Sequence, residues 1–290
     1  MALLTIDVGG TSIKYASFDK GQLAHKGVKD TPKTLEGFYD TFKIIKDEIS
    51  EKVELTGIAI SCPGAVSKAD GVIYGASAIP YIHNFPIKTA FEELLGLPVS
   101  VENDANCAAL AEVSYGAGKA YQDLLFFVIG TGIGGAVVLD KKIRHGAHLM
   151  GGEFGFMLMG DTTLSVDASP VRMAQDYNAA HGTSYQGQEI FALAESGDQA
   201  AQERVATLFD SLARAIFNLQ YALDPEIILL GGGISQADFL IPKLQAALQV
   251  VYDKVGISTI MPQIAVCEFQ NDANLIGAAA DFLAEHDDFA

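Results

Sequence analysis

The sequence predicts a two-lobed α/β protein whose lobes carry mixed β-sheets and are related by internal duplication. The chain has 290 residues, 49% of them hydrophobic, so it can bury a large core but is long for one compact unit. A buried strand at residues 3–8 and a returning strand at 13–18 form a hairpin around a glycine turn. The same pattern recurs in strands at 124–129 and 136–139, joined by the glycines of 130–135. This echo indicates a duplicated fold.

Between and after the hairpins, helices alternate with strands. In the first half, apolar periodicity and turn residues predict strands at 22–28, 56–61 and 99–102, helices at 36–52, 87–95 and 104–115, and loops with short strands at 63–86. In the second half they predict helices at 170–180, 187–195, 198–223, 237–253 and 273–285 and strands at 227–230 and 263–266. We therefore expect a smaller N-terminal lobe over 1–115, completed by the terminal helix at 273–290, and a larger C-terminal lobe over 116–272.

The charge and composition of the chain indicate which kinds of molecule it binds. The formal net charge is −17 and the pI is near 4.6, which disfavours nucleic acid and anionic membrane surfaces. No basic segment with an apolar core opens the sequence, and no uncharged apolar run reaches transmembrane length. Cys62, Cys107 and Cys267 are widely spaced and odd in number, which suits reduced core thiols. We expect a soluble, cytoplasmic protein with small-molecule partners, no nucleic acid and no membrane.

Three glycine clusters follow apolar strands, at 9–10, 130–135 and 231–233. Glycines at strand ends expose backbone N–H groups that can hold a phosphate. The cluster at 130–135 has the spacing of a dinucleotide fingerprint, but a strand rather than a helix follows it, and no P-loop sequence occurs. A hairpin turn explains each cluster taken singly, whereas three together favour phosphate chemistry. Lys14 is a secondary candidate, because a lone lysine on a short strand is commonly a solvated charge.

The segment Glu102-Asn-Asp-Ala-Asn106 sets a carboxylate beside amides where a strand meets a helix. Asn103 or Asp104 is placed to cap that helix, which is the simpler explanation. The same groups suit a polyhydroxylated substrate and can accept a hydroxyl proton, so Asp104 is the candidate base. Glu153 lies in a glycine-bounded turn and is either a surface charge or a further carboxylate for such a substrate.

Five segments, taken in order, resemble the ROK family, which comprises repressors, open reading frames and sugar kinases. They are Asp7-Val-Gly-Gly-Thr-Ser-Ile-Lys14, Glu102-Asn-Asp-Ala-Asn106, Gly130-Thr-Gly-Ile-Gly-Gly135, Gly151-Gly-Glu-Phe-Gly155 and Gly231-Gly-Gly233. The likeness continues to residues 272–278 and so covers nearly the whole chain. It implies an actin-like (ribonuclease H-like) ATPase fold with a cleft between the lobes, and an ATP-dependent sugar kinase.

The resemblance also implies a role for individual residues. Asp7 would lie near Mg²⁺ and the phosphates, and Asp104 would take the proton of the attacking hydroxyl, usually the one on C6 of a hexose. The residues implied for ATP are Asp7, Gly9, Gly10, Thr11, Thr131, Gly132, Gly232 and Gly233, with Lys14 as the secondary contact. The residues implied for the sugar are Gly64, Asn103, Asp104 and Glu153. ATP and Mg²⁺ are the implied cofactors, and a homodimer is the implied assembly.

The sequence departs from the common family pattern after Glu153. Most members continue with a histidine, a cysteine-rich zinc cluster and a further sugar-binding glutamate. Here Phe156 takes the histidine position, residues 157–169 contain no cysteine, and Ser165 stands roughly where the glutamate would be. We therefore expect no zinc site, interpret His145 and His148 as loop residues, and expect a relaxed or shifted choice of sugar. This pattern is similar to a subgroup that includes β-glucoside kinases.

Several alternatives stay open at this point. The sugar is glucose, fructose, mannose, N-acetylmannosamine or a β-glucoside. A sugar-responsive repressor is a weaker hypothesis, because the first strand begins at Leu3 and we expect no helix-turn-helix domain before it. A catalytically silent sugar-binding protein is a further alternative, which the retained Asp104 and glycine loops disfavour. ATP hydrolysis with and without sugar separates a kinase from a silent binder.

Overall fold

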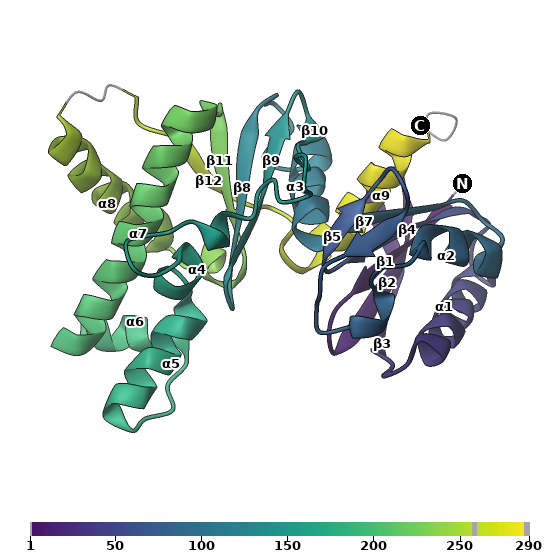
Figure 1. Cartoon of the computed structure of the whole chain (residues 1–290), viewed down its shortest axis with the longest axis horizontal. Helices are drawn as coiled ribbons and strands as arrows, with labels where there is room; N and C mark the ends of the chain where they lie inside the picture. Colours follow the sequence, from purple (N-terminus) through teal and green to yellow (C-terminus); the bar gives the residue numbers. More distant parts are fainter. Residues whose placement is uncertain (1, 257–259, 287–290) are drawn as a thin grey trace. The chain divides into compact units, whose positions relative to one another are not determined.

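The computed structural model describes residues 2–256 and 260–286, which form two compact units (Figure 1). Unit 1 consists of Met1–Lys119, His145–Met150 and Phe269–Ala290, and unit 2 of Ala120–Arg144 and Gly151–Glu268. The C-terminal end of the predicted lobe-completing helix, residues 287–290, lies outside the described residues. The short segment His145–Met150 thus belongs to a different unit from the residues that flank it.

Unit 1 is built on a mixed sheet with strand order β3-β2-β1-β4-β7. Its strands are β1 (Ala2–Val8), β2 (Ser12–Asp19), β3 (Gln22–Asp30), β4 (Leu55–Cys62) and β7 (Val99–Asn103). β1, β2 and β3 pair antiparallel, whereas β1, β4 and β7 run parallel. The predicted N-terminal hairpin is confirmed, and the parallel arrangement brings the carboxyl ends of β1, β4 and β7 to one edge.

Helices cover both faces of this sheet. They are α1 (Leu35–Ser50), α2 (Ile87–Leu95), α3 (Asp104–Tyr115) and α9 (Ala273–Glu285), with the short elements β5 (Ala65–Ser67), β6 (Val72–Tyr74), η1 (Pro80–Ile82) and η4 (Gln270–Asp272). α3 and α9 lie side by side (Figure 1). A Cβ on Gly277 would overlap the carbonyl oxygen of Cys107, so glycine is what allows α9 to pack this closely on α3. The C-terminal helix is therefore an integral part of unit 1.

Unit 2 repeats the same sheet topology with strand order β10-β9-β8-β11-β12. Its strands are β8 (Leu124–Ile129), β9 (Ile133–Leu139), β10 (Lys142–Ile143), β11 (Ile227–Gly231) and β12 (Ile264–Val266). β8, β9 and β10 pair antiparallel, and β8, β11 and β12 run parallel. The duplication inferred from the two hairpins is confirmed strand by strand.

The second hairpin differs from its prediction at one end. β9 begins at Ile133 rather than at residue 136, because Gly134 and Gly135 are extended and pair with β8. A Cβ on Gly135 would lie 2.5 Å from the Phe154 ring, so this glycine serves close packing rather than a turn. A strand still follows the glycines, which confirms that the cluster is not a dinucleotide fingerprint.

The helices of unit 2 pack on its sheet around a large apolar core. They are α4 (Leu164–Asp167), α5 (Pro170–His181), α6 (Gly187–Glu195), α7 (Gln199–Leu223) and α8 (Leu240–Val255), with the 3-10 turns η2 (Phe154–Phe156) and η3 (Gly233–Gln236). Helical spacing in residues 198–223 puts Val205, Leu208, Leu212, Ile216 and Leu219 on one stripe of α7; the first four are buried, and Leu219 is partly buried against the same core. Cys62 and Cys107 in unit 1 and Cys267 in unit 2 are buried, as predicted for core residues.

Candidate active site

The end of β1 carries a buried carboxylate. Asp7 is 9% exposed, and its Oδ1 accepts hydrogen bonds from Ser61 Oγ at 3.1 Å and Asn274 Nδ2 at 2.9 Å. Ser61 lies on β4 and Asn274 on α9, so three segments distant in sequence fix the orientation of this side chain. Oδ2 takes part in neither bond. A carboxylate oriented in this way is suited to a hard cation.

The tight turn after Asp7 depends on glycine. The Gly9 N–H donates to Ser12 O at 2.9 Å, and a Cβ on Gly9 would lie 2.9 Å from the same oxygen. Gly10 and Thr11 are exposed at the tip of the turn, and the Thr11 carbonyl accepts the Thr31 N–H at 3.0 Å. Lys14 follows on β2 and is half-buried opposite Asp7 in the strand register. The turn therefore offers backbone N–H groups and one cation beside a carboxylate.

At the junction of β7 and α3, the Asn103 side chain is held from both sides. Its Oδ1 accepts the N–H groups of Ala105 (2.9 Å) and Asn106 (3.1 Å), which caps α3, and its Nδ2 donates to Gly64 O at 3.0 Å. Gly64 has φ +110°, a conformation that favours glycine. Asp104 is the first residue of α3, next to this cap. The sequence-predicted sugar residues Gly64, Asn103 and Asp104 thus lie together.

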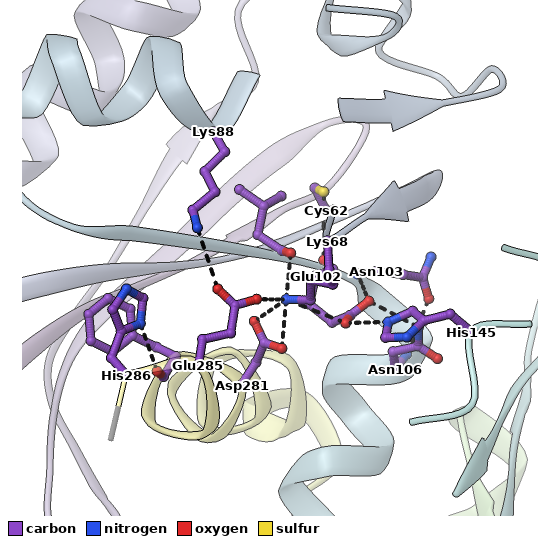
Figure 2. A network of polar contacts seen from close by, with 12 residues as sticks. Cys62, Lys68, Lys88, Glu102, Asn103, Asn106, His145, Asp281, Glu285 and His286 are labelled. Carbon is purple, nitrogen blue, oxygen red and sulfur yellow. Dashed lines mark hydrogen bonds and ion pairs between the residues drawn. The ribbon is translucent and has the colours of Figure 1, made fainter. Parts of the chain in front are cut away.

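Directly before this junction stands Glu102, a buried carboxylate whose two oxygens are both engaged. It is 1% exposed; its Oε1 accepts from Asn103 N at 2.7 Å and from Asn106 Nδ2 at 3.0 Å. Its Oε2 lies 2.7 Å from His145 Nε2 and 3.5 Å from Lys68 Nζ. Figure 2 shows the His145 ring and the Lys68 ammonium approaching this carboxylate. A buried charge is tolerated because it is paired and hydrogen-bonded in this way.

Lys68 links Glu102 to the C-terminal helix. Its Nζ lies 2.7 and 2.6 Å from the two oxygens of Asp281 and 2.6 Å from Glu285 Oε1, and it also donates to Val101 O at 2.8 Å (Figure 2). Asp281 and Glu285 lie on α9. One ammonium group therefore lies within ion-pair distance of three carboxylates. We call these groups and His145 the Glu102 cluster: Lys68, Glu102, His145, Asp281 and Glu285.

Burial and neighbouring charges shift the pKa values of three groups in the Glu102 cluster. Burial alone would raise the pKa of Glu102, but the hydrogen bond from His145 and the charge of Lys68 outweigh burial and lower that pKa. The bond to Glu102 raises the pKa of His145 despite partial burial. Burial raises the pKa of Asp281 to about 7, against the attraction of Lys68. These contacts favour the ionised form of Glu102, and His145 Nε2 lies closer to its Oε2 than Lys68 Nζ does.

In unit 2, the turn between β8 and β9 is held by a backbone hydrogen bond and by the hydroxyl of Ser169. Gly130 N–H donates to Gly132 O at 3.0 Å, and Ser169 Oγ donates to the carbonyl oxygens of Gly130 (2.7 Å) and Thr131 (3.0 Å). Ser169 also caps α5, because its Oγ accepts the Arg172 N–H at 3.2 Å. The predicted phosphate residues Thr131 and Gly132 therefore lie on an ordered turn against the start of a helix.

A pocket of about 490 Å³ adjoins this turn. Its lining is Val128, Gly130, Thr131, Gly132, Ile133, Gly134, Glu153, Gly155, Phe156, Thr163 and Ser165. Burial raises the pKa of Glu153 even though its side chain keeps contact with solvent. Phe156 is 67% exposed, and Ser165 Oγ accepts the Ile133 N–H at 2.9 Å. The residues that replace the usual histidine and glutamate thus line the same pocket as Glu153.

A larger, mostly apolar pocket of about 600 Å³ lies at the ends of β8 and β11. Its lining is Ile129, Gly130, Pro170, Val171, Gly187, Gln188, Phe191, Gly233, Ile234, Gln236, Ala237, Asp238 and Phe239. Gly232 has φ +87°, and a Cβ there would overlap the carbonyl oxygen of Ile129, so the backbone of this turn runs against β8. The pocket has the size and apolar character that suit a nucleoside.

The predicted site residues therefore fall into two groups, each assembled within one unit. Unit 1 holds Asp7, Gly9, Gly10, Thr11, Lys14, Gly64, Asn103 and Asp104, and unit 2 holds Thr131, Gly132, Glu153, Gly232 and Gly233. Sequence reasoning missed the pairing of Glu102 with His145, which it interpreted as a loop residue. A signal was present, since a carboxylate that ends an apolar strand needs a partner of opposite charge.

Two features are absent from the part of the chain that the structure describes. Over residues 2–256 and 260–286, no three His, Cys, Asp or Glu side chains gather into a group that could hold a metal ion. No helix within those residues is long and apolar enough to cross a membrane.

A duplicated mixed sheet with glycine turns at its strand ends defines the class of actin-like, two-domain ATPase folds. The sequence model of the ROK family matches residues 3–285. The chain belongs to the ROK family.

Relatives of known name agree with this assignment. The chain is 31% identical to a β-glucoside kinase from Listeria monocytogenes, over 98% of each chain. It matches the structure of a ROK family protein from Streptococcus pneumoniae in complex with sucrose, with a TM-score of 0.91, 36% identity and coverage of 99% of this chain and 100% of that one. A glucokinase from Streptomyces griseus in complex with glucose and AMPPNP gives a TM-score of 0.75 at 26% identity, over 96% and 98% of the two chains.

Proposed function

We propose that the chain transfers the γ-phosphoryl group of Mg-ATP to the C6 hydroxyl of a hexose unit, with Asp104 as the general base. The coarser class follows from family and relatives: the chain is an ATP-dependent carbohydrate kinase. One observation carries the finer assignment. Asp104 opens α3 beside an Asn103 side chain that is locked by two helix N–H groups and by Gly64 O. A carboxylate on a rigid junction is what positioning of an acceptor hydroxyl requires.

The nucleotide assignment rests on unit 2. The apolar pocket beside Gly233 suits adenosine, and the turn at Thr131 and Gly132 suits the phosphates. When bound, Mg-ATP supplies the transferred group and a cation that neutralises its charge. Asp7 is the candidate contact for that cation, because its carboxylate is held by Ser61 and Asn274. Phosphate oxygens and water would complete the coordination, as is usual for Mg²⁺.

The acceptor assignment rests on the polar groups around Asp104. The Asp104 carboxylate accepts the proton that the sugar hydroxyl loses as its oxygen bonds to phosphorus, and the Asn103 amide orients a neighbouring hydroxyl. Glu153 lies in a pocket with the phosphate turn, where a carboxylate can accept hydrogen bonds from further hydroxyls. In this proposal Asp104 takes the proton of the attacking hydroxyl, and Glu153 accepts hydrogen bonds from the other hydroxyls of the sugar.

A β-glucoside is the second candidate substrate, and Phe156 favours it. This ring is 67% exposed and lines the same pocket as Glu153, at the position where most of the family carries a histidine. An exposed aromatic ring gives apolar surface on which a second sugar ring or an aglycone can pack. The β-glucoside kinase from Listeria monocytogenes, 31% identical to this chain, supports this alternative.

The test is an ADP-release assay over glucose, fructose, mannose, N-acetylmannosamine and a β-glucoside such as cellobiose, with ³¹P NMR to locate the phosphate on the product. We expect one of these sugars to stimulate ADP release and to be phosphorylated on C6. Asp104→Asn should bind that sugar but turn it over at least about 100-fold more slowly. Sugar binding without stimulated ADP release in the wild-type protein would instead identify a silent sugar-binding protein.

A further inference from the structure

We propose that His145 is a positioning residue for sugar phosphorylation: through Glu102 it holds the strand-to-helix junction that carries Asn103 and Asp104. The inference rests on the proposed function and concerns the same site. It begins from a contact that no sequence motif announces, the 2.7 Å approach of His145 Nε2 to Glu102 Oε2 (Figure 2).

Glu102 is coupled directly to the junction. Its Oε1 accepts the backbone N–H of Asn103, which is the peptide that leads into α3, and the side-chain amide of Asn106 in the first turn of that helix. The carboxylate therefore contacts the residues on both sides of Asp104. Any rotation of the Glu102 side chain breaks at least one of these bonds, and the Asn103–Asp104 backbone must adjust.

His145 is the group that fixes the remaining oxygen. A carboxylate only accepts, so Nε2 carries the hydrogen and donates to Oε2. Lys68 is more distant from Glu102, at 3.5 Å, and is bound at 2.6–2.7 Å by Asp281 and Glu285 on α9. Without His145, Oε2 would turn toward this ammonium, because it is the nearest remaining cation. That movement pulls Glu102 away from the junction and toward α9.

The segment that carries His145 supports the same conclusion. His145–Met150 packs as part of unit 1, although the residues before and after it belong to unit 2. The side chain of His145 is 27% exposed, whereas that of Glu102 is 1% exposed, so the ring reaches from the surface segment to a buried carboxylate. His148, three residues later, is exposed and offers a matched histidine in the same segment.

The experiment compares His145→Gln, His145→Ala and His148→Ala with the wild-type protein, using the sugar that is the substrate. Glutamine carries an amide N–H near the place of Nε2, so His145→Gln should keep kcat within about threefold. His145→Ala should lower kcat about 10- to 100-fold, because misplacing a catalytic group by about 1 Å has an effect of that order. The affinity for the ATP analogue AMPPNP should stay within twofold of wild type, and His148→Ala should match wild type throughout.

Two outcomes overturn the proposal: His145→Ala with wild-type kcat, or equal losses in His145→Ala and His145→Gln. If His145→Ala does not fold, His145→Asn replaces it, since its shorter amide does not reach Glu102. Calorimetric sugar binding is measured on every variant and does not depend on turnover. A wild-type protein that phosphorylates no sugar refutes the proposed function, whereas an active wild type with an equally active His145→Ala refutes only the positioning role.

Discussion

The two sheets of this protein share one topology but carry different chemistry at equivalent edges. β1, β2, β4 and β7 of unit 1 correspond in order and direction to β8, β9, β11 and β12 of unit 2. The register places Asp7 opposite Lys14 in one hairpin and Val128 opposite Gly134 in the other. A carboxylate and a cation in unit 1 thus stand where unit 2 has an apolar residue and a glycine.

The next strands repeat this contrast. β4 and β11 are each followed by a glycine of positive φ, Gly64 at +110° and Gly232 at +87°. In unit 1 the Gly64 carbonyl holds the Asn103 amide, whereas in unit 2 Gly232 lets the backbone run against β8 beside an apolar pocket. The two units therefore share a glycine of positive φ after equivalent strands, whereas the side chains around that glycine differ. Unit 1 suits an acceptor and its proton, and unit 2 suits a nucleoside.

The largest effect that we expect is a loss of folding stability when the buried charges of unit 1 are altered. Lys68→Met removes the ammonium that Glu102, Asp281 and Glu285 share, leaving buried carboxylates without their common partner. We expect a loss of roughly 3 kcal/mol of stability. Hydrogen–deuterium exchange should locate it, with faster exchange in α3 and α9 and unchanged exchange in β8 and β11.

The control for Lys68 is Lys43→Met. Lys43 pairs with Asp40 at 3.4 Å on the surface of the same unit, with both side chains at least half exposed. Such a pair contributes about 0–1 kcal/mol. Equal effects of the two substitutions, or faster exchange spread over both units, would contradict the buried role of Lys68.

The second-largest effect that we expect is a loss of nucleotide affinity when the turn at Gly232 in unit 2 is altered. Gly232→Val introduces a side chain that overlaps Ile129 O at a backbone of φ +87°, and this should displace the turn beside the apolar pocket. We expect the affinity for AMPPNP to fall by about 100-fold or more while sugar binding persists, as measured by calorimetry. Gly197→Val is the matched control, because Gly197 has φ +98° but open space around its Cβ. Similar losses in both variants would mean that backbone strain alone is responsible.

A smaller effect that we expect is a change in the preference between a β-glucoside and glucose when Phe156 is replaced. Phe156→Ala removes an exposed ring from the pocket of Glu153, so kcat/KM for a β-glucoside should fall about tenfold, whereas that for glucose should change less than threefold. The measurement is the ratio of the two kcat/KM values. Leu158→Ala, at a 76% exposed residue close by in sequence, is the control. An unchanged ratio for Phe156→Ala would remove the observation that favours a β-glucoside.

The smallest effect is a pH dependence of stability. Because the bond to Glu102 raises the pKa of His145 above its ordinary value of 6.5, its stabilising contribution is complete below that pH and is lost as pH rises through the raised pKa. The charged groups near it, Glu102, Lys68 and Asp281, are common to wild type and His145→Gln. The stability advantage of wild type over His145→Gln in urea should therefore be largest below pH 6.5 and shrink as the pH rises through the raised pKa of His145. A constant or growing difference would contradict the charged pair.

Much of the fold followed from local patterns. Strand, glycine turn and strand are short-range signals, and both hairpins were predicted from them, as were α2 (Ile87–Leu95) and α3. The start of β9 was not, because Gly134 and Gly135 resemble turn residues in sequence. In the structure both pair with β8, and the Phe154 ring fills the space that a side chain on Gly135 would need. Packing between distant segments overrode the local preference there.

The site was predictable to a lesser degree. Asn103 and Asp104 could be located because capping is a local signal at the start of a helix. The bond between Glu102 and His145 spans 43 positions and depends on how residues 145–150 pack on unit 1, which no periodicity in the sequence encodes. Lys68 and Asp281 are 213 positions apart and illustrate the same point.

The central claim, that unit 1 supplies the base and unit 2 the pocket for the nucleoside, is tested most directly by measuring turnover and AMPPNP affinity of Asp104→Asn in parallel. We predict that kcat falls at least about 100-fold while the dissociation constant for AMPPNP stays within about twofold of wild type. An Asp104→Asn variant that keeps wild-type turnover, or that loses AMPPNP binding together with turnover, would contradict this division of function.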